Sequence, residues 1–549
     1  MASAYASVSD GSHESDLAES RNSSLASKYE SRTSDRGPFL ARARQCSALT
    51  LPYLMPQTGT AATDLATPFQ STGARGVNNL AAKLLLALFP PNAPFFRLTV
   101  DPFALEKVAP VAGAQSEIEK SLVKIEGAVQ RDIEKDNFRV TSFEALKHLL
   151  ICGNVLHRYP AKNGDCHRVF HMDSYVVERD HSTGNPVLIV TKETVREESL
   201  TPALRAAVLA ANASGGEESI DGKEFDLYTG YFLNDSQQWE THQEIAGESV
   251  PGSDGTYTID TMPCLALRGL SISGEDWGRS YVEEYLGDLQ SLEGLAQALV
   301  EGAAAAARLL FLVNPNGLTD AKECTKAQNG AFVEGVEGDI TVLQMQKFAD
   351  FQVAGNTANQ IKSDLERAFI MNSAVQRAGE RVTAEEIRYV AQELEQILGG
   401  TYSILSKEYQ LPIVTRAMAR MTKENRIPKL PKDVVSPSII TGIEALGRGN
   451  DMNRMAMAGQ ALATILGPGV MNTFVNLPEF VKRFFVSAQV PIDNLLKDPA
   501  VLAQEQQQQN TNAVVHNVAP EVVKQIGQHS QMMLAAQQQQ PQQGAPAPQ

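Results

Sequence analysis

The stretch NSAVQRAGERVTAEEIRYVAQELEQILGGTYSILSKEYQLP, residues 372–412, says most about the fold. Helical spacing of apolar residues fails over 372–382, which predicts an irregular segment. Thr383 and Glu386 then form a capping box, in which each side chain bonds a free backbone amide beside the other, and an apolar stripe follows. The Gly-Gly pair at 399–400 weakens helix in the middle of that stripe. We therefore expect a loop followed by a long, kinked helix that runs toward 412.

Two further long helices are predicted upstream of this stretch. Ser280 and Glu283 form another capping box, and apolar residues then recur at helical spacing over 280–310. The stripe consists of Val282, Tyr285, Leu286, Leu289, Leu292, Ala296, Leu299 and Ala303. A Gly-rich, mixed segment follows at 311–349, and helical spacing returns over 350–371. The pattern predicts two long helices that flank a small, compact insertion.

The N-terminal half mixes helices with short β-type runs. Helical spacing covers 36–90 and stops at two prolines, and Thr141 with Glu144 starts a capped helix that ends near residue 153. The β-type runs are separated by Asn-Gly, Gly-Asn and other Gly turns. They cover 155–159, 169–170, 175–178, 187–191, 228–233 and 239–245. We expect a small antiparallel sheet within an α+β, mainly helical fold.

The two ends of the chain lack the composition of a folded core. Residues 1–35 are rich in Ser and acidic groups, and residues 499–549 are rich in Gln, Pro and Ala. We expect a mobile lead-in, which is neither a signal peptide nor an anchor, and a largely disordered tail.

Charge and cysteine content limit the possible functions. Among 549 residues, 48 Lys and Arg stand against 64 Asp and Glu, a net charge of -16 that disfavours tight, nonspecific binding to nucleic acid. Five Cys without a Cys-x-x-Cys pair predict a reducing compartment such as the cytoplasm. The longest apolar runs, 84–89 and 303–313, are too short to cross a membrane, so both are interpreted as buried helix segments.

The common signatures of enzymes are missing from the sequence. It contains no Gly-x-x-x-x-Gly-Lys phosphate loop, no His-Glu-x-x-His and no Gly-x-Ser-x-Gly. The pairs Glu283–Glu284 and Glu385–Glu386 lie in first turns of helices, where the helix dipole favours acidic residues, so capping is a better interpretation than acid–base catalysis. The sequence therefore predicts no enzyme and no cofactor.

One segment concentrates side chains of the kind that bind metals. It holds His148, Cys152, His157, Cys166, His167 and His171. Such residues can supply a tetrahedral zinc site, but the spacings match no standard pattern. Buried or hairpin positions explain them better, and we expect no metal site.

The helix that starts at Ser280 carries an excess of acid. Its acidic residues, counted from just before its start, are Asp276, Glu283, Glu284, Asp288, Glu293 and Glu301. An acidic face is often only a solvated surface. The alternative is a wall that duplex DNA passes without sticking, because like charges prevent the contacts that release counterions.

Four segments resemble one protein family. They are GARGVNNLAAKLLLALFP (73–90), SFEALKHLLICGNVL (142–156), GRSYVEEYLGDLQSLE (278–293) and residues 372–406 of the stretch quoted first. These segments, and the order of elements from about residue 29 to 449, resemble the portal, or head-to-tail connector, proteins of short-tailed bacteriophages of the autographivirus (T-seven-like) type.

The resemblance implies a dodecameric ring around a central channel, at one vertex of the capsid, through which double-stranded DNA is packaged and ejected. The implied parts are a flexible segment 1–35, a wing 36–275, stem helix 276–310, clip 311–349, stem helix 350–371, tunnel loop 372–382, long wing helix 383–431, crown 432–498 and tail 499–549. The implied partners are further copies of the chain, the major capsid protein, scaffolding protein, terminase large subunit, tail adaptor, internal core proteins and DNA. The ring is expected in the virion after assembly in the host cytoplasm, without contact to a membrane.

Specific residues follow from that division. Gln376, Arg377 and Arg381 of the tunnel loop are candidates for contact with DNA phosphates, unless the arginines pair with Glu380 or with acids of a neighbouring subunit. Glu283, Glu284, Asp288 and Glu293 would form the acidic channel wall. Lys322 and Lys326 of the clip are candidates for docking terminase or tail adaptor, or else solvated lysines. The remaining alternatives are a tail-tube or scaffold protein without a DNA channel, and a hydrolase with an unfamiliar site.

Overall fold

A computed structural model describes residues 24–57, 59–91, 94–100, 114–135, 137–160, 165–215, 222–307, 310–343, 348–371, 390, 392–394, 396–398, 404–431, 434–440, 457, 460–461 and 464. The chain divides into two units, Met1–Arg448 and Gly449–Gln549, and the sheets, the core helices and the long helix pair belong to the first. No helix among the described residues is both long and apolar enough to span a bilayer.

Helix α2 (Leu25–Ala48) begins ten residues before the expected end of the mobile lead-in, so that expectation is wrong from residue 25 onward. Leu25 and Tyr29 are buried against the neighbouring sheet. The backbone N–H of Leu25 and the Ser24 hydroxyl both donate to the carboxylate of Glu244, at 2.6 and 2.7 Å. A distant carboxylate thus supplies the partner that the start of the helix needs, which local composition does not reveal.

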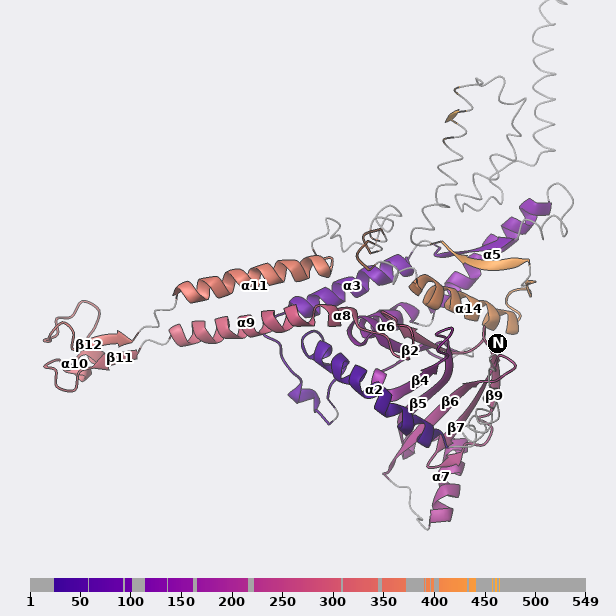
Figure 1. Ribbon diagram of the computed structural model, residues 1–549, viewed down its shortest axis with the longest axis horizontal. Helices are drawn as coiled ribbons and strands as arrows, with labels where there is room; N and C mark the ends of the chain where they lie inside the picture. The colour runs from indigo at the N-terminus through magenta and orange to yellow at the C-terminus, as the bar shows by residue number, and fades with distance from the viewer. Residues whose placement is uncertain are drawn as a thin grey trace, which may run out of the picture. The chain divides into compact units, whose positions relative to one another are not determined.

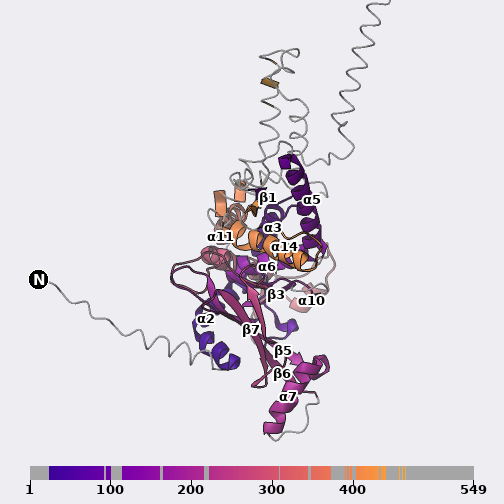
Figure 2. The same ribbon diagram turned by 90° about the vertical axis from the view of Figure 1, so that its right-hand side faces the viewer.

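The larger sheet is antiparallel throughout. Its strands are β4 (Tyr175–Arg179), β5 (Pro186–Arg196), β6 (Glu224–Leu233), β7 (Gln238–Ile245) and β8 (Glu248–Ser249), in that order, with β9 (Gly255–Thr258) also paired to β7. Helix α2 packs along this sheet, and α7 (Pro202–Gly215) packs near its end against β7 and β8 (Figures 1 and 2).

A second, three-stranded sheet has the order β10-β2-β3, formed by β2 (Asn154–Arg158), β3 (Arg168–Phe170) and β10 (Cys264–Arg268). The antiparallel pairing expected from the β-type runs is confirmed. The expectation of one sheet is wrong, because β3 does not pair with β4. Strands β2 and β3 instead form a separate sheet with β10, which pairs with β2 from more than 100 residues away in the sequence.

Helices and one strand pair build the rest of the core. They are α3 (Thr72–Leu88), α5 (Ala114–Lys135), α6 (Phe138–Cys152), α14 (Leu411–Lys423), and the antiparallel pair β1 (Phe96–Val100) and β13 (Val435–Ile439). Short single turns η1 (Ala62–Asp64), η2 (Met172–Ser174) and η3 (Glu197–Ser199) connect elements.

Helix α6 starts earlier than predicted. Asn137 precedes its first residue, and the Thr141 hydroxyl bonds back to the Asn137 carbonyl at 3.4 Å instead of capping a start at Ser142. The predicted end is confirmed, since Gly153 closes the helix in the left-handed conformation with φ 70°.

The two predicted long helices are present and lie side by side. After the single turn α8 (Tyr281–Glu284), α9 (Leu286–Ala306) packs against α11 (Phe348–Ala368), and a Cβ on Gly302 would stand 2.4 Å from the Phe351 ring. Between them the chain forms β11 (Leu310–Val313), α10 (Ala321–Lys326) and β12 (Ile340–Leu343), with β11 and β12 paired. In Figure 1 this insertion lies at the far end of the helix pair.

The apolar run 303–313 is not a buried helix segment, contrary to expectation. It is divided between the end of α9 and strand β11, and Ala303 and Phe311 are exposed in the single chain. Its counterpart 84–89 is confirmed, because it includes buried Leu84 and Phe89.

The helix that the sequence pattern follows toward 412 extends beyond that residue, within the range 383–431 that the resemblance implies. A π-helical turn, η4 (Ser406–Gln410), leads into α14, so that Pro412 stands in the first turn of α14 and the helix continues to Lys423. The helix already runs through η4 at this point, so Pro412 is a proline within a helix, next to a π-turn. The Gly-Gly pair at 399–400, where the kink is predicted, lies outside the described residues.

Candidate functional site: the root of the α9–α11 helix pair

The start of the helix pair is fixed to α6 through Ser280. Its hydroxyl accepts the Glu283 N–H at 3.1 Å, which confirms the Ser280 half of the predicted capping box, and donates to the Leu150 carbonyl at 2.8 Å. One side chain therefore caps α8 and also bonds the last turn of α6, where carbonyls lack partners within their helix. The direction in which α8 leaves the body is set by this double contact.

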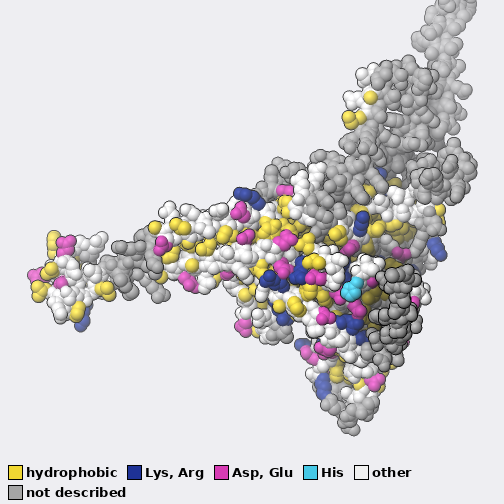
Figure 3. Space-filling view, in the orientation of Figure 1, with side chains coloured by type: hydrophobic (Ala, Val, Ile, Leu, Met, Phe, Trp, Pro, Cys, Tyr) yellow, Lys and Arg dark blue, Asp and Glu magenta, His cyan; other side chains and the backbone are white. Residues whose placement is uncertain are grey.

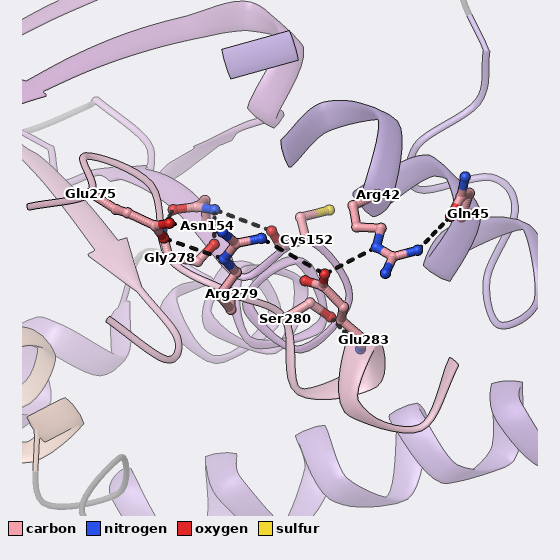
Figure 4. A network of polar contacts seen from close by, with 9 residues as sticks. All are labelled: Arg42, Gln45, Cys152, Asn154, Glu275, Gly278, Arg279, Ser280 and Glu283. Carbon is pink, nitrogen blue, oxygen red and sulfur yellow. Dashed lines mark hydrogen bonds and ion pairs between the residues drawn. The ribbon is translucent and has the colours of Figure 1, made fainter. Parts of the chain in front are cut away.

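A pair of backbone segments crosses beside Ser280 at very short range. Asn154 bonds Gly278 in both directions, its Nδ2 to the carbonyl and its Oδ1 from the N–H, each at 2.8 Å (Figure 4). Gly269 donates to the Gly153 carbonyl at 2.8 Å. A Cβ on Gly153 would lie 2.4 Å from the carbonyl carbon of Arg279, so only glycine fits there.

Charged groups surround this crossing. Arg279 bonds the Glu275 carboxylate at 2.8 Å and stands over the ring of Phe39 at 4.7 Å. The Glu283 carboxylate accepts a hydrogen bond from Nε of Arg42 on α2 at 3.1 Å, and it lies 3.9 Å from the Arg279 guanidinium (Figure 4). The ion pairs connect α2, the segment after β10 and α8, and thereby add contacts between three elements that meet at the root.

The other end of the pair, where α11 terminates, is held by polar side chains of α3. Asn79 Nδ2 donates to the carbonyls of Phe369 and Ile370, both at 3.0 Å, and Lys83 Nζ donates to Ile370 at 2.8 Å. Helix C-termini carry free carbonyls and partial negative charge, which an amide and an ammonium group satisfy. A Cβ on Gly76 would stand 2.6 Å from the Phe369 ring, so α3 and α11 approach closely.

Lys83 is buried while it makes these contacts. Burial lowers its pKa, and Glu393, 3.4 Å away, acts in the opposite direction. Tyr281 of α8 donates its hydroxyl to the Ala368 carbonyl at 2.8 Å. The last turn of α11 is thus fixed to both α3 and α8, directly before the predicted tunnel loop.

Ile370 closes α11 in a strained conformation. Its φ is 55°, in the left-handed region that β-branched residues rarely adopt, and Met371 N–H bonds back to the Glu366 carbonyl at 2.8 Å. Such a conformation costs roughly 1–3 kcal/mol and persists only where surrounding contacts impose it. The contacts of Asn79 and Lys83 to the Ile370 carbonyl supply that constraint.

The four residues of the predicted acidic wall have two kinds of surroundings. Glu283 is paired with arginines, and the Glu293 carboxylate accepts the N–H groups of Phe69 and Gln70 at 2.7 and 3.2 Å. Glu284 and Asp288 are exposed. Two of the four therefore serve contacts within the chain, and two face solvent in the single subunit.

The other predicted site residues lie apart from this root. Gln376, Arg377 and Arg381 fall outside the described residues. Lys322 and Lys326 belong to α10 in the insertion, and both are exposed. The sequence interpretation missed Asn79, Lys83, Gly153 and Asn154. Only Lys83 gave a signal, as a single charge within the apolar run LAAKLLLALF.

The six histidines and cysteines of the predicted ligand-rich segment separate into groups. His167 Nδ1 lies 3.2 Å from His157 Nε2, His157 Nδ1 lies 3.0 Å from the Tyr409 hydroxyl, and Tyr409 donates to Ser142 at 3.0 Å. Since Tyr409 has one proton to donate, His157 donates to it and accepts from His167. Cys166 is exposed, and His148, Cys152 and His171 form a separate group.

Both histidines of this chain of hydrogen bonds are held neutral. Burial lowers the pKa of His157 to about 3, with further contributions from His167 and Arg416. Burial and the positive charge of Arg420 lower the pKa of His167 to about 4. An added proton on His157 would also face the N–H of His167, which excludes the charged form from the folded state at neutral pH.

Acidification from pH 7 to pH 5 is therefore expected to destabilise the fold. Between the ordinary histidine pKa near 6.5 and the lowered values, the unfolded chain binds more protons, so stability falls as pH falls, by up to about 1.4 kcal/mol per unit for each histidine. Urea unfolding at both pH values measures this loss. His167→Gln should reduce the loss, whereas His181→Gln, at an exposed histidine, should leave it unchanged. Equal stability of the unaltered chain at both pH values would contradict the prediction.

Comparison with known proteins identifies the family. The family model described as bacteriophage head to tail connecting protein matches residues 22–496. The portal protein of Escherichia phage T7 is 41% identical over 488 residues, 88% of this chain and 89% of the relative. The portal protein of Enterobacteria phage T3 is 42% identical over 454 residues, which cover 81% of this chain and 84% of the relative. The portal protein of Enterobacteria phage SP6 is 29% identical over 514 residues, which cover 92% of this chain and 97% of the relative. The resemblance seen in the sequence is confirmed: the chain belongs to the bacteriophage head-to-tail connecting protein family.

Proposed function

We propose that this chain is the subunit of a phage portal, a dodecameric ring whose channel passes double-stranded DNA into the capsid and out again. The family and its portal relatives support the role itself. The function is mechanical: the subunit supplies a shaped, largely inert passage and a docking platform, while another protein supplies the energy.

The proposal of a ring rests on apolar surface that a single subunit leaves exposed. The exposed side chains include Val300 on α9, Val353 on α11, and Phe311, Leu312, Leu318, Phe332 and Val336 in the insertion. Figure 3 shows apolar side chains along the helix pair and on the insertion beyond it. A two-stranded sheet such as β11–β12 is marginal alone, and contiguous apolar patches mark association surfaces. Neighbouring copies of the same elements would cover both.

The division into parts follows from this assembly. The helix pair α9–α11 would be the stem, the β11–α10–β12 insertion the clip, the remaining α+β body the wing, 372–382 the tunnel loop and 432–498 the crown. Exposed Glu284 and Asp288 suit a channel wall that repels phosphate, because their carboxylates face solvent while those of Glu283 and Glu293 serve contacts within the chain. Lys322 and Lys326 on α10 suit contact with acidic surfaces of a terminase or a tail adaptor.

In this proposal, capsid and scaffolding proteins surround the wing, and core proteins contact the crown. The ring is assembled in the host cytoplasm and becomes part of the virion. A virion protein without a channel, such as a tail-tube or scaffold component, is the competing function.

Class averages of the purified full chain by electron microscopy test the proposal. Closed rings of twelve subunits with a channel wide enough for duplex DNA are expected. A double variant, Phe311→Ser with Phe332→Ser, should shift the population toward monomers, since both side chains are largely exposed apolar surface in the single chain. Filaments, or monomers of the unaltered chain at micromolar concentration, would overturn the ring and favour the competing function.

The tunnel-loop arginines give a separate prediction. Replacing Arg377 and Arg381 together with Ala should shorten the packaged DNA or reduce its retention while rings still form, because the loop would lose its phosphate contacts. Packaged length is measured by pulsed-field gel electrophoresis of DNA from filled heads. Arg196→Ala with Arg205→Ala serves as the control, because it also removes two positive charges, both from exposed ion pairs on the α+β body, and should leave packaged length unchanged. Unchanged packaged length in the double variant would refute the contact.

A further inference from the structure

Three side chains away from the helix root come together in a way that the portal role does not explain. Glu144 and His148 are one turn apart on α6, and His171 stands directly before η2, in the connection between β3 and β4. One ligand atom of each lies within 4.8 Å of the others. Within the described part of the chain, this is the one group of three or more His, Cys, Asp or Glu side chains so close together.

One ring nitrogen of His148 is buried in this cluster without a hydrogen bond to a described residue. The residue is 1% exposed, and its Nε2 has no hydrogen-bond partner among the described residues. Its Nδ1 stands 4.0 Å from the Cys152 sulfur, a weak contact. A buried ring nitrogen without a partner is unfavourable, so something that the protein atoms do not supply is expected at Nε2.

His171 is oriented as metal-bound histidines are. Its Nδ1 lies 3.1 Å from the Leu54 carbonyl, which can only accept, so Nδ1 carries the proton and Nε2 keeps its lone pair. Metal-binding imidazoles usually donate their second ring nitrogen to such an acceptor. The rings of His148 and His171 are 4.7 Å apart between centroids, edge to face.

The three side chains stand at different depths in the cluster. The His148 ring is buried, whereas the Glu144 carboxylate lies at the edge of the cluster, toward solvent.

We propose that Glu144, His148 and His171 bind one divalent transition-metal ion, with zinc the best match to the ligands. Two imidazoles and one carboxylate suit zinc and its neighbours, whereas calcium and magnesium require oxygen ligands. With zinc–ligand distances of about 2.0–2.1 Å, ligand atoms in a tetrahedron stand roughly 3.3 Å apart, so modest side-chain shifts close the site. A water molecule would fill the fourth position.

The bound ion would act as a structural link within the body of the subunit. It would join α6 to the β3–β4 connection and, through the His171 contact to Leu54, to the segment that follows α2. The sequence pattern led us to expect no metal, because it offered six candidates without a standard spacing. Folding selects two of the six and adds Glu144, which the pattern did not suggest.

Zinc binding to the purified full chain tests the proposal, in a Cys166→Ser background that removes an exposed thiol. After treatment with chelator, one tightly bound zinc per chain is expected by equilibrium dialysis, with a rise of a few degrees in the unfolding midpoint at saturating zinc. Cobalt in place of zinc should give the visible absorption of a four-coordinate site. Glu144→Gln and His171→Gln, neither of which alters a fully buried residue, should weaken binding by about 100-fold or more.

His181→Gln provides the matched control, because it removes an exposed histidine outside the cluster. It should bind zinc and cobalt as the background chain does. The proposal is overturned if the background chain takes up no stoichiometric zinc, or if Glu144→Gln and His171→Gln retain its affinity. Ring formation by the variants, followed by electron microscopy, separates this outcome from a failure of the portal proposal.

Discussion

Replacing Gly153 with alanine is expected to destabilise the chain by about 3 kcal/mol or more and to prevent normal ring assembly. The added methyl group would lie 2.4–2.6 Å from three backbone atoms of Arg279 and Ser280, which no side-chain rotation can relieve. The φ of 70° adds the cost of a left-handed conformation for a residue with a Cβ. Because Ser280 is the cap of α8, the displacement would redirect the whole helix pair. Chemical denaturation and electron microscopy of the variant measure both effects.

A second glycine separates the clash from the conformation. Gly252 has nearly the same φ, 75°, but nothing lies within 4 Å of its absent Cβ. Gly252→Ala should therefore cost about 1 kcal/mol and leave rings intact. If both variants lost the same stability, the close approach at Gly153 would not be what makes this position intolerant.

Replacing Asp132 with asparagine is expected to cost about 3–5 kcal/mol, the second of the two largest effects. Asp132 on α5 is 2% exposed, and one of its oxygens accepts from Arg420 of α14 while the other accepts from Arg426. Asparagine keeps the shape but removes the charge, so the buried guanidinium of Arg420 would lose its carboxylate. Urea denaturation at pH 7 measures the loss.

Acid dependence distinguishes a charge effect from a packing effect. Burial by itself would raise the pKa of Asp132, but the hydrogen bonds from Arg420 and Arg426 lower it below its ordinary value. The stabilisation is therefore complete above the unfolded pKa of about 3.9 and is lost as pH falls through the lower folded pKa. The difference between variant and unaltered chain should be constant from pH 5 to 8 and shrink below pH 4.

Asp226→Asn is the control for this prediction. Asp226 forms a 2.9 Å ion pair with Lys192 on the sheet surface, where its side chain is 43% exposed. Exposed pairs contribute about 1 kcal/mol or less. A loss at Asp226 as large as that at Asp132 would show that burial does not decide the value of these ion pairs.

The helices of the α9–α11 pair follow from local rules. The capping box at Ser280 starts α8 where the sequence predicts, because a hydroxyl and the amide three residues on need nothing from the rest of the chain. The positions of α9, α11 and the intervening insertion follow equally from spacing and turn residues. The predicted start of α6 was wrong because Thr141 and Glu144 match the capping pattern although they lie inside the helix, which begins at Phe138.

The contacts at the helix root could not be predicted, since their partners are distant in sequence. Asn79 meets the Ile370 carbonyl across 291 residues and Asn154 meets Gly278 across 124. Neither asparagine stands in a local sequence pattern that indicates its partner. The pairing of β2 with β10 and the early start of α2 have the same cause, because both partners come from far along the chain.

The sequence by itself determined the family, the long helix pair with its insertion, and the acidic, enzyme-motif-free character of the chain. These properties are written in periodicity, capping residues and composition, which act over a few neighbouring residues. Only the tertiary structure decided which acidic side chains bond other groups of the same subunit and which glycine cannot be replaced. It also decided which two of the six histidines and cysteines meet beside Glu144. Such properties depend on packing between elements, where a distance of about 1 Å separates a hydrogen bond from a clash.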